Sequence, residues 1–179
     1  THRQSSAASD VYKRQEEGGA KLMVDEGVLN DPPVDAIVGL HISQGGPAGT
    51  ASYRTRGFMA SAQRFDVRVE GKQTHGARPW SGIDPIVVSA QIINGLQTIV
   101  SRQIDITQHP AVVTVGTISA GVRMNIVPDE AVFSGTIRTF DSSVRGEIHA
   151  KIRSIVENVS ESMGAKGFLE IDPGVPVTF

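Results

Sequence analysis

The chain contains 179 residues, of which 39% are apolar, 20% charged and 5% aromatic, an ordinary composition for a soluble domain with a sizeable core. Seventeen Lys and Arg residues against nineteen Asp and Glu residues give a formal net charge of -2, which excludes a global basic field for nucleic acid. The sequence has no membrane-length apolar run, no secretory signal and no cysteine. We therefore expect a cytoplasmic protein, and any metal in it must be held by His, Asp and Glu.

Both ends of the chain differ from its middle. The first fifteen residues, THRQSSAASDVYKRQ, show neither helical nor strand periodicity, and DVYKRQ reads as a translated sequencing adapter. We interpret residues 1–15 as a non-native scar. The last residues, PVTF, form an extended segment without a cap or turn, so the sequence is expected to be an internal fragment.

Residues 16–57 form the first predicted domain. Glu16–Gly27 is predicted as a short helix that ends at Gly27. The continuous apolar run Ala36–Leu40 is typical of a strand that is covered on both faces, as in a parallel sheet. Residues 49–56 are predicted as a loop and a connecting strand. We place a domain boundary near residue 57.

The second predicted domain begins with a strand and a helix. Strict alternation puts Phe65, Val67 and Val69 on the buried face of the strand. Asp84 is an expected N-cap before Pro85, which starts the helix. The expected apolar stripe of this helix consists of Ile86, Ala90, Ile93, Leu96 and Val100.

Two further strands, a second helix and a last strand follow. Val112–Ile118 and Ala131–Thr139 are predicted strands joined through a turn, and Lys166–Ile171 is the last strand. The second helix runs from about Val144 to Met163, with Gly164 as its stop and an apolar stripe of Val144, Ile148, Ile152, Ile155, Val159 and Met163. The order strand, helix, strand, strand, helix, strand is the split βαβ, ferredoxin-like arrangement. The free face or edge of such a sheet favours pairing with a second copy.

Three residues of the first domain are candidates for metal chemistry. Glu16 and Glu17 are adjacent carboxylates that point in different directions. One could bind a metal while the other accepts a proton from metal-activated water, or both could simply complement a helix dipole. His41 follows a strand end, where ligands gather in open α/β sheets, or it is a hydrogen-bonded structural histidine. His109 and His149 are read as surface residues.

Three residues of the second domain are candidates for substrate chemistry. His75 lies in the polar loop Gly71–Pro79 and could donate a hydrogen bond to a developing oxyanion, unless the loop is merely solvated. Asn125 and Arg138 could together hold a substrate carboxylate, since a guanidinium fork binds it in bidentate fashion. Taken singly, each also reads as a turn Asn or a strand-surface Arg.

Five segments carry a family resemblance in order and with matching spacing: EEGGAKLMVDEGVL, VDAIVGLHI, RGFMASAQRFDVRVEGKQTHGARPWSGIDPI, VTVGTISAGVRMNIVPDEA and SGTIRTF. From residue 16 onward the chain resembles the metal-dependent aminoacylase and carboxypeptidase superfamily, and within it the N-acyl-amino-acid amidohydrolases related to hippurate hydrolase and indole-acetyl-amino-acid hydrolases. The resemblance implies a partial zinc-peptidase-like α/β catalytic domain in residues 16–57. A ferredoxin-like lid and dimerisation domain would follow over residues 58–172, and residues 173–179 would return to the catalytic domain.

The resemblance also implies roles for the candidate residues of the metal site and the lid. Glu16 matches the general base, and Glu17 and His41 match metal ligands. His75 matches a lid histidine that reaches the active site of the partner subunit and stabilises the oxyanion.

By the same resemblance, Asn125 and Arg138 match lid residues that bind the substrate's carboxylate. The implied activity is metal-dependent hydrolysis of the amide bond of N-acyl-amino acids by a homodimer, with two divalent ions (Zn, Mn, Co or Ni) per site and no nucleic-acid or membrane partner. The family's remaining metal ligands have no counterpart in this sequence, so the chain alone is expected to be inactive. The alternative is a metal-free ferredoxin-like binding or oligomerisation module.

Overall fold

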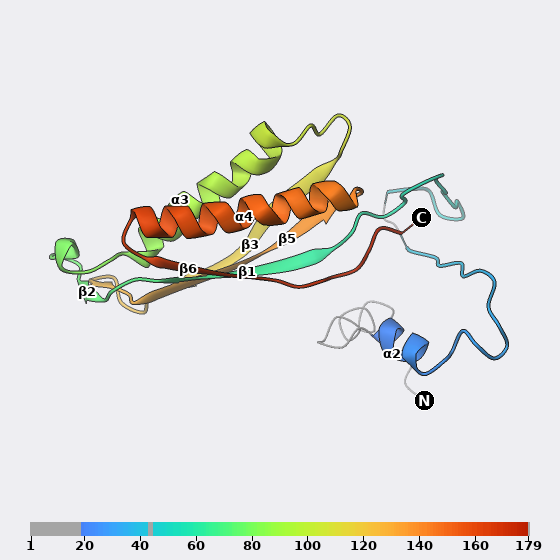
Figure 1. Ribbon diagram of the computed structural model, residues 1–179, viewed down its shortest axis with the longest axis horizontal. Coiled ribbons are helices and arrows are strands. Elements are labelled where there is room, and N and C mark those ends of the chain that lie inside the picture. The colour runs from blue at the N-terminus through green and yellow to red at the C-terminus, as the bar shows by residue number, and fades with distance from the viewer. Residues whose placement is uncertain (1–18, 43–44, 179) are drawn as a thin grey trace. The chain divides into compact units, whose positions relative to one another are not determined.

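The computed structural model describes residues 19–42 and 45–178 (Figure 1). The chain divides into two compact units, Thr1–Thr50 and Ala51–Phe179. Three of our predictions, for Glu16, for Glu17 and for a scar over residues 1–15, lie outside the described residues. No helix within these ranges is long and apolar enough to cross a membrane.

The described part of the first unit contains one helix, α2 (Gly19–Asp25). Gly27 has a φ of +86° and donates its N–H to the Val24 carbonyl at 2.9 Å, while the Val28 N–H reaches the Met23 carbonyl at 3.0 Å. These two hydrogen bonds satisfy carbonyls that the helix end leaves free, and glycine adopts the positive φ without strain. The predicted stop at Gly27 is confirmed.

The strands predicted at Ala36–Leu40 and within residues 49–56 are wrong. Neither segment forms a strand, and Val38 and Leu40 are 95% and 91% exposed. A strand buried on both faces needs neighbouring strands for its backbone hydrogen bonds and covering layers for its side chains. The described part of the chain supplies neither segment with such a neighbour. The apolar run therefore lies open to solvent.

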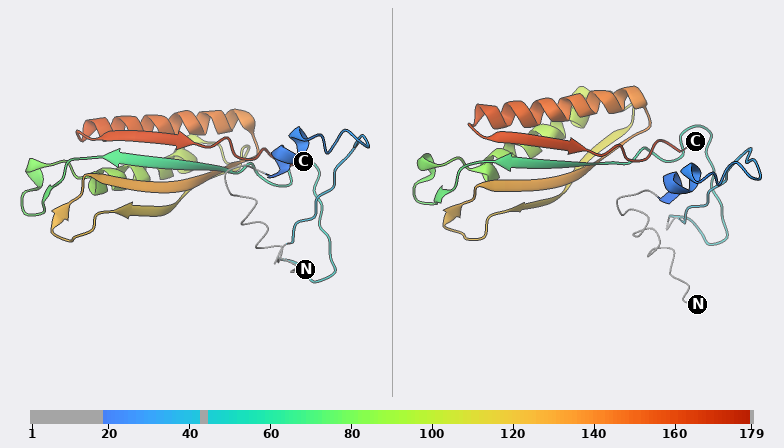
Figure 2. Two further views of the ribbon diagram at one scale, coloured as in Figure 1. Left: turned by 90° about the horizontal axis from the view of Figure 1, so that it is seen from below. Right: turned by 60° about the horizontal axis from the view of Figure 1, so that its bottom comes forward.

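The second unit is built on one four-stranded antiparallel sheet in the order β3-β5-β1-β6. Its strands are β1 (Gln63–Glu70), β3 (Ala111–Ala120), β5 (Glu130–Thr139) and β6 (Lys166–Ile171). Helices α3 (Pro85–Thr98), which continues as a π-helical turn η2 (Ile99–Gln103), and α4 (Ser142–Ser162) cover one face of the sheet (Figure 1, Figure 2). The predicted ferredoxin-like arrangement is confirmed.

The core lies between this sheet and the two helices. Phe65, Val67 and Val69 alternate inward along β1 and are buried, as predicted. They meet Ile92 and Leu96 of α3, which are fully buried, and the inward-facing residues of α4.

The buried face of α3 is rotated away from the predicted stripe. Only Leu96 belongs to both sets, because the buried residues of α3 are Pro85, Val88, Ser89, Ile92 and Leu96. The helix carries apolar residues at adjacent positions, so its pattern fits two rotations equally well. The side chains of Val88, Ile92 and Leu96 enter the core cluster, and the start of the helix lies close to Gly71, where a Cβ would be 2.7 Å from the Pro85 ring.

The apolar stripe of α4 is confirmed for Val144, Ile148 and Ile152, which are buried. Asp141 caps this helix through the N–H groups of Ser143 and Val144, a cap that the sequence analysis missed. The chain then leaves the helix at Gly164, whose φ is +78°, so the predicted stop is confirmed. Met163, beside this turn, is exposed rather than part of the core.

The chain reaches and leaves the sheet through two neighbouring segments, which we call the incoming segment (residues 58–62) and the outgoing segment (residues 172–178). They pair antiparallel, with Ala62 and Val175 exchanging hydrogen bonds of 3.1 and 2.9 Å. Gly174 turns the outgoing segment at a φ of +61°, and a Cβ there would lie 2.0 Å from the Ala62 carbonyl oxygen. Only glycine fits this position.

A polar chain joins α4 to the outgoing segment. His149 Nε2 lies 2.8 Å from Gln63 Oε1, and Gln63 Nε2 donates to the carbonyls of Asp172 (3.1 Å) and Pro173 (3.3 Å). The reading of His149 as a plain surface residue is therefore wrong, because its ring is partly buried against this buried glutamine. His109, by contrast, lies 3.0 Å from a carboxylate oxygen of Asp141.

Candidate functional site

A small two-stranded sheet lies at one end of the second unit, at the left in Figure 1. It pairs β2 (Thr74–His75) with β4 (Ile126–Val127), and the Gly76 N–H donates to the Asn125 carbonyl at 2.8 Å. A short 3-10 helix, η1 (Pro79–Ser81), follows β2. We call this end of the sheet, with the loop 121–125, the tip. Strands of two residues are too short to show periodicity, so the sequence pattern does not predict either of them.

This pairing brings His75 and Asn125 to the same place. The Ala77 backbone N–H donates to His75 Nδ1 at 3.1 Å, which makes Nδ1 an acceptor. A neutral imidazole with Nδ1 accepting carries its proton on Nε2. The His75 ring is exposed, and its Nε2 has no hydrogen-bond partner among the residues that the structure describes. The ring therefore offers an oriented N–H donor at the tip.

The loop before Asn125 has a fixed backbone. Gly121 has a φ of +68°, and the Ile126 N–H closes a turn on the Arg123 carbonyl at 3.3 Å. Asn125 is exposed, and within the described ranges its side-chain amide makes no hydrogen bond. The tip thus presents two polar side chains, an imidazole and an amide, that are free to bind a ligand.

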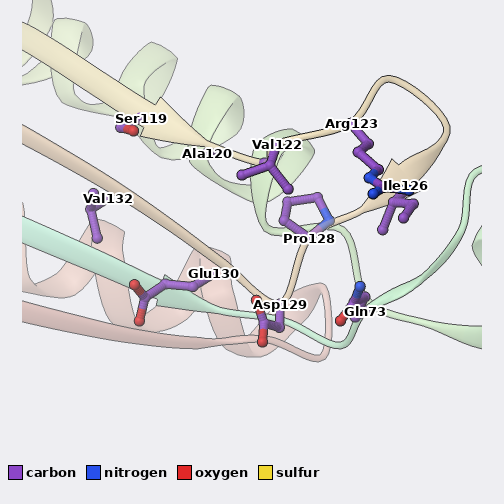
Figure 3. A pocket seen from close by; sticks show the side chains of 11 residues that line it. Gln73, Ser119, Ala120, Val122, Arg123, Ile126, Pro128, Asp129, Glu130 and Val132 are labelled. Carbon is purple, nitrogen blue, oxygen red and sulfur yellow. The ribbon is translucent and has the colours of Figure 1, made fainter.

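An open cavity of about 560 Å³ adjoins this loop (Figure 3). Its size falls in the range of small-molecule sites. Figure 3 shows Val122 and Pro128 side by side, with the carboxylates of Asp129, just before β5, and of Glu130, the first residue of β5, also beside the cavity. The complete lining is Gln73, Ser119, Ala120, Gly121, Val122, Arg123, Ile126, Pro128, Asp129, Glu130 and Val132. The lining is mixed and does not by itself select one class of ligand.

Arg138 lies far from the tip. It stands on the helix-free face of β5 opposite Val112, while Glu130, at the other end of β5, pairs with Glu70. Eight residues of strand at roughly 3.3 Å each separate Arg138 from Glu130 by about 26 Å. The fold therefore does not bring Asn125, at the tip, and Arg138 of the same chain together.

The other arginines of this sheet face already have partners. Arg64 pairs with Asp66 at 2.7 Å, and Arg68 pairs with Glu70 and Glu130. The guanidinium of Arg68 also lies 4.1 Å from the centre of the Phe168 ring.

Two hydrogen bonds stabilise the charged form of Asp66, the partner of Arg64. Burial raises the pKa of Asp66, but hydrogen bonds from Arg64 and the Ser134 hydroxyl outweigh burial and hold this pKa below its ordinary value. Arg138 differs, because it is half-buried and forms no ion pair within the described part of the chain. Arg138 is therefore the guanidinium of this face that remains available to an anion.

His41 follows the exposed apolar run of the first unit. Its Nδ1 lies 2.8 Å from the Ile42 carbonyl, so Nδ1–H donates and the Nε2 lone pair stays free. A backbone carbonyl on one ring nitrogen is the usual orientation of a metal-binding histidine. Among residues 19–42 and 45–178, no group of three or more His, Asp or Glu side chains is arranged to hold a metal.

Comparisons with known proteins agree on one family. The model of the peptidase dimerisation domain matches residues 60–163. The chain is 39% identical over 158 residues to N-acetyl-L-cysteine deacetylase of Bacillus subtilis, which covers 88% of this chain and 37% of that protein. It is 36% identical over 157 residues to N-acyl-L-amino acid amidohydrolase of Geobacillus stearothermophilus, covering 88% of this chain and 42% of the relative. The chain thus spans less than half the length of these relatives.

The solved structures give the same result. The Bacillus subtilis YXEP protein, described as a dinuclear metal-binding peptidase of the M20 family, is 32% identical with a TM-score of 0.67, over 89% of this chain and 38% of that one. The aminobenzoyl-glutamate utilization protein of Klebsiella pneumoniae shares the fold at 24% identity, with a TM-score of 0.67 over 89% of this chain and 39% of that one. The chain belongs to the M20 peptidase family, through its dimerisation domain.

Proposed function

We propose that a full-length protein carrying this chain is a metal-dependent hydrolase of the cytoplasm that cleaves the amide bond of N-acyl-amino acids. The observation that carries the proposal is the tip, where β2 and β4 hold His75 and Asn125 together and leave the Nε2–H of His75 free to donate. Two relatives support the substrate class, since they are described as an N-acetyl-L-cysteine deacetylase and an N-acyl-L-amino acid amidohydrolase.

The proposed roles divide between the two predicted domains. Residues 16–57 belong to the catalytic domain, where Glu17 and His41 would hold a divalent metal and Glu16 would act as general base. The free Nε2 lone pair of His41 fits this role, and the YXEP relative is described as binding two metals. Zinc, manganese, cobalt or nickel would polarise the scissile carbonyl and activate the attacking water. Glu16 would take the proton of that water and pass it to the leaving amine.

Residues 58–172 would supply the remaining groups as a lid and dimerisation domain. His75 would donate its Nε2–H to the oxyanion that develops on the scissile carbonyl. Arg138 would bind the amino-acid carboxylate through its guanidinium fork, and Asn125 would position the same substrate from the other side. The lack of an ion pair at Arg138 within the described residues supports this role, because a substrate carboxylate could bind its guanidinium without displacing a carboxylate of the protein.

The two sides of the lid differ in charge, which indicates where a second copy pairs. The sheet has two edges: β6 carries Lys166 and Glu170, whereas β3 contains no charged residue. The helix that contacts β3 is α3, which is also free of charged residues, whereas α4, beside β6, is rich in them. Natural sheets protect exposed edges with charges, so the uncharged edge at β3 fits an interface. We propose a homodimer through β3 and α3.

Such a dimer would resolve the separation of Arg138 from the tip. If two β3 edges pair about a twofold axis perpendicular to the strands, they run antiparallel, and the tip of each copy would lie beside the far end of the partner's sheet. His75 and Asn125 of one copy would then meet the Arg138 of the other. Each active site would need both chains.

A complementation experiment tests the composite site. In the full-length protein, His75→Ala and Glu16→Gln are each expected to be inactive on N-acetyl- and N-benzoyl-amino acids with zinc, manganese or cobalt. Mixing and re-dimerising the two variants should restore about a quarter of the wild-type rate, because about half the dimers are mixed and each has one intact site. No recovery would overturn the shared site. A wild-type protein that hydrolyses no N-acyl-amino acid with any of these metals would overturn the proposed function and favour a non-catalytic module.

A further inference from the structure

The free edge of β3 is interrupted near its middle. Its register with β5 passes from Val115 directly to Thr117, and Gly116 forms a β-bulge between them. A bulge disrupts the hydrogen-bond ladder and twists the strand, and natural sheets use bulges to block pairing at an exposed edge. The edge is therefore divided into two separate surfaces, which we call the far half (residues 111–115) and the tip half (residues 117–120).

Exposed apolar side chains lie beside the tip half. Ile118 is opposite the buried Phe133, so it points to the helix-covered side of the sheet, yet it is 54% exposed. Helix α3 begins at the same end of the domain, shortly after η1. Its first turn exposes Ile86 and Val87 by 42% and 47%. The uncharged side of the domain thus has apolar surface at its tip end.

The surroundings of the far half are polar. The last turn of α3 and the turn η2, which contacts β3, expose Gln97, Thr98, Ser101, Arg102 and Gln103. Beyond Val87, no exposed side chain of α3 or η2 is a large apolar one. Because charged residues are depleted from the core of an interface, a contact between two copies fits the tip half better than the far half.

The position of Arg138 also depends on which half pairs. When two β3 strands pair antiparallel about a twofold axis, the residue at the axis lies opposite its own copy. With Ile118 or Ser119, the middle of the tip half, at the axis, the partner's Val112 would be level with about the fourth to sixth residue after the end of β3, counted along an extended chain. Arg138 pairs with Val112, so the partner's Arg138 would be level with the tip, where Asn125 is the fifth residue after β3.

The far half does not bring these groups together. With Val113 at the axis, the partner's Arg138 would be level with Thr114 of the first copy. Thr114 lies about 20 Å along the strand from Ala120, where β3 ends, and the tip lies farther still. An arginine side chain does not span that distance.

We infer that the tip half of β3 and the first turn of α3 form the contact between two copies, and that the bulge at Gly116 sets the register in which the tip reaches the partner's Arg138. This inference rests on the proposed function, which needs both chains at each site. The match of residues 60–163 to a peptidase dimerisation domain supports a second copy as the occupant. The contact would bury Ile86, Val87 and Ile118, apolar side chains that a single copy leaves in water.

Cysteine cross-linking tests the register, because the chain contains no cysteine of its own. Ile118→Cys and Ser119→Cys each place a thiol at or next to the axis. Val112→Cys and Thr114→Cys are the matched controls on the far half, since all four side chains are exposed. A short bismaleimide is added to each variant of the chain at a concentration where sedimentation velocity shows a dimer. We expect covalent dimers from the two tip-half variants and none from the controls, whose thiols would lie about 26 Å or more apart.

The outcomes separate this inference from the function on which it rests, because cross-linking needs no activity. Covalent dimers from Val112→Cys or Thr114→Cys would overturn the tip-half contact, and so would the lack of a covalent dimer from either tip-half variant. A wild-type chain that stays monomeric at every concentration would overturn it as well. Covalent dimers from the tip-half variants, together with a full-length protein that hydrolyses no N-acyl-amino acid, would support the contact and overturn the proposed function.

Discussion

One backbone contact decides what His75 can do. Because Ala77 donates to Nδ1, the neutral ring presents Nε2–H, the tautomer that an oxyanion donor requires. We expect His75→Ala to lower kcat of the full-length protein by about 100- to 1,000-fold, with a much smaller change in KM. The reason is that the hydrogen bond from His75 Nε2–H to the oxyanion strengthens only in the transition state. His109→Ala, which removes a half-buried histidine outside the tip, serves as the control. Steady-state kinetics with equal losses in both variants would contradict the role of His75.

His149 makes folding sensitive to pH. Burial lowers the pKa of this imidazole below its ordinary value of 6.5, and the charges of Arg145 and Arg153 lower it further. The unfolded chain therefore takes up a proton at a higher pH than the folded chain. Stability should fall as the pH drops below about 6.5 and should level off once the folded histidine is also protonated.

The comparison variant for this prediction is His149→Gln, because its amide can still donate to Gln63 but does not titrate. We expect the urea midpoint of the wild type to fall relative to that of the variant between about pH 7.5 and pH 5.5. Parallel curves for the two proteins would show that His149 does not carry the pH dependence.

At the scale of the element, the start of α3 depends on Asp84. Its carboxylate accepts from the N–H groups of Ile86 (2.9 Å) and Val87 (3.3 Å), two donors that have no partner within the helix. We expect Asp84→Ala to lower the free energy of unfolding by about 1 kcal/mol, and Asp84→Ser to retain most of the cap. Chemical denaturation of the chain measures both. An equal loss of unfolding free energy in the two variants would mean that the side-chain cap does not stabilise the N-terminus of α3.

The same elements show how far the sequence predicts the structure. The sequence predicts a helix boundary correctly where a single residue determines it, as at the Asp84 cap and the Gly27 stop. It also predicts the buried face of a strand where apolar and polar residues alternate strictly, as in β1. The rotation of α3 was not predictable, because its apolar residues fit two faces and only packing against the sheet and α4 distinguishes the two. The run Ala36–Leu40 failed for a different reason, since a buried strand depends on neighbours outside its own pattern.

The candidate site shows the same limit. Sequence picked out His75 and Asn125 one at a time, but it could not indicate that two-residue strands place them together. It also paired Asn125 with Arg138, because nearness along the chain says nothing about the end of a strand at which a residue lies. Register and strand length, rather than residue type, decide which side chains meet.

At the scale of the whole molecule, the uncharged side of the dimerisation domain predicts how copies associate. Ala90 on α3 and Ala150 on α4 are both exposed alanines on helices that cover the same sheet. Ala90→Arg should convert the proposed dimer to a monomer, because it buries an unpaired charge at the interface, and Ala150→Arg should leave the dimer intact. Sedimentation velocity on the two variants makes the comparison. A dimer that survives Ala90→Arg would exclude this face of α3.

The pairing of the incoming and outgoing segments has a consequence for how such proteins arise. Because Ala62 and Val175 are hydrogen-bonded neighbours, the chain enters and leaves the four-stranded sheet at adjacent positions. A gene segment encoding it could be spliced into a surface loop of an unrelated host, and the host would have to bridge only a gap the width of two strands. Closing so short a gap costs little chain entropy, so the graft and its host could each keep their own fold. The closeness of its two ends thus makes this domain suited to insertion into other proteins.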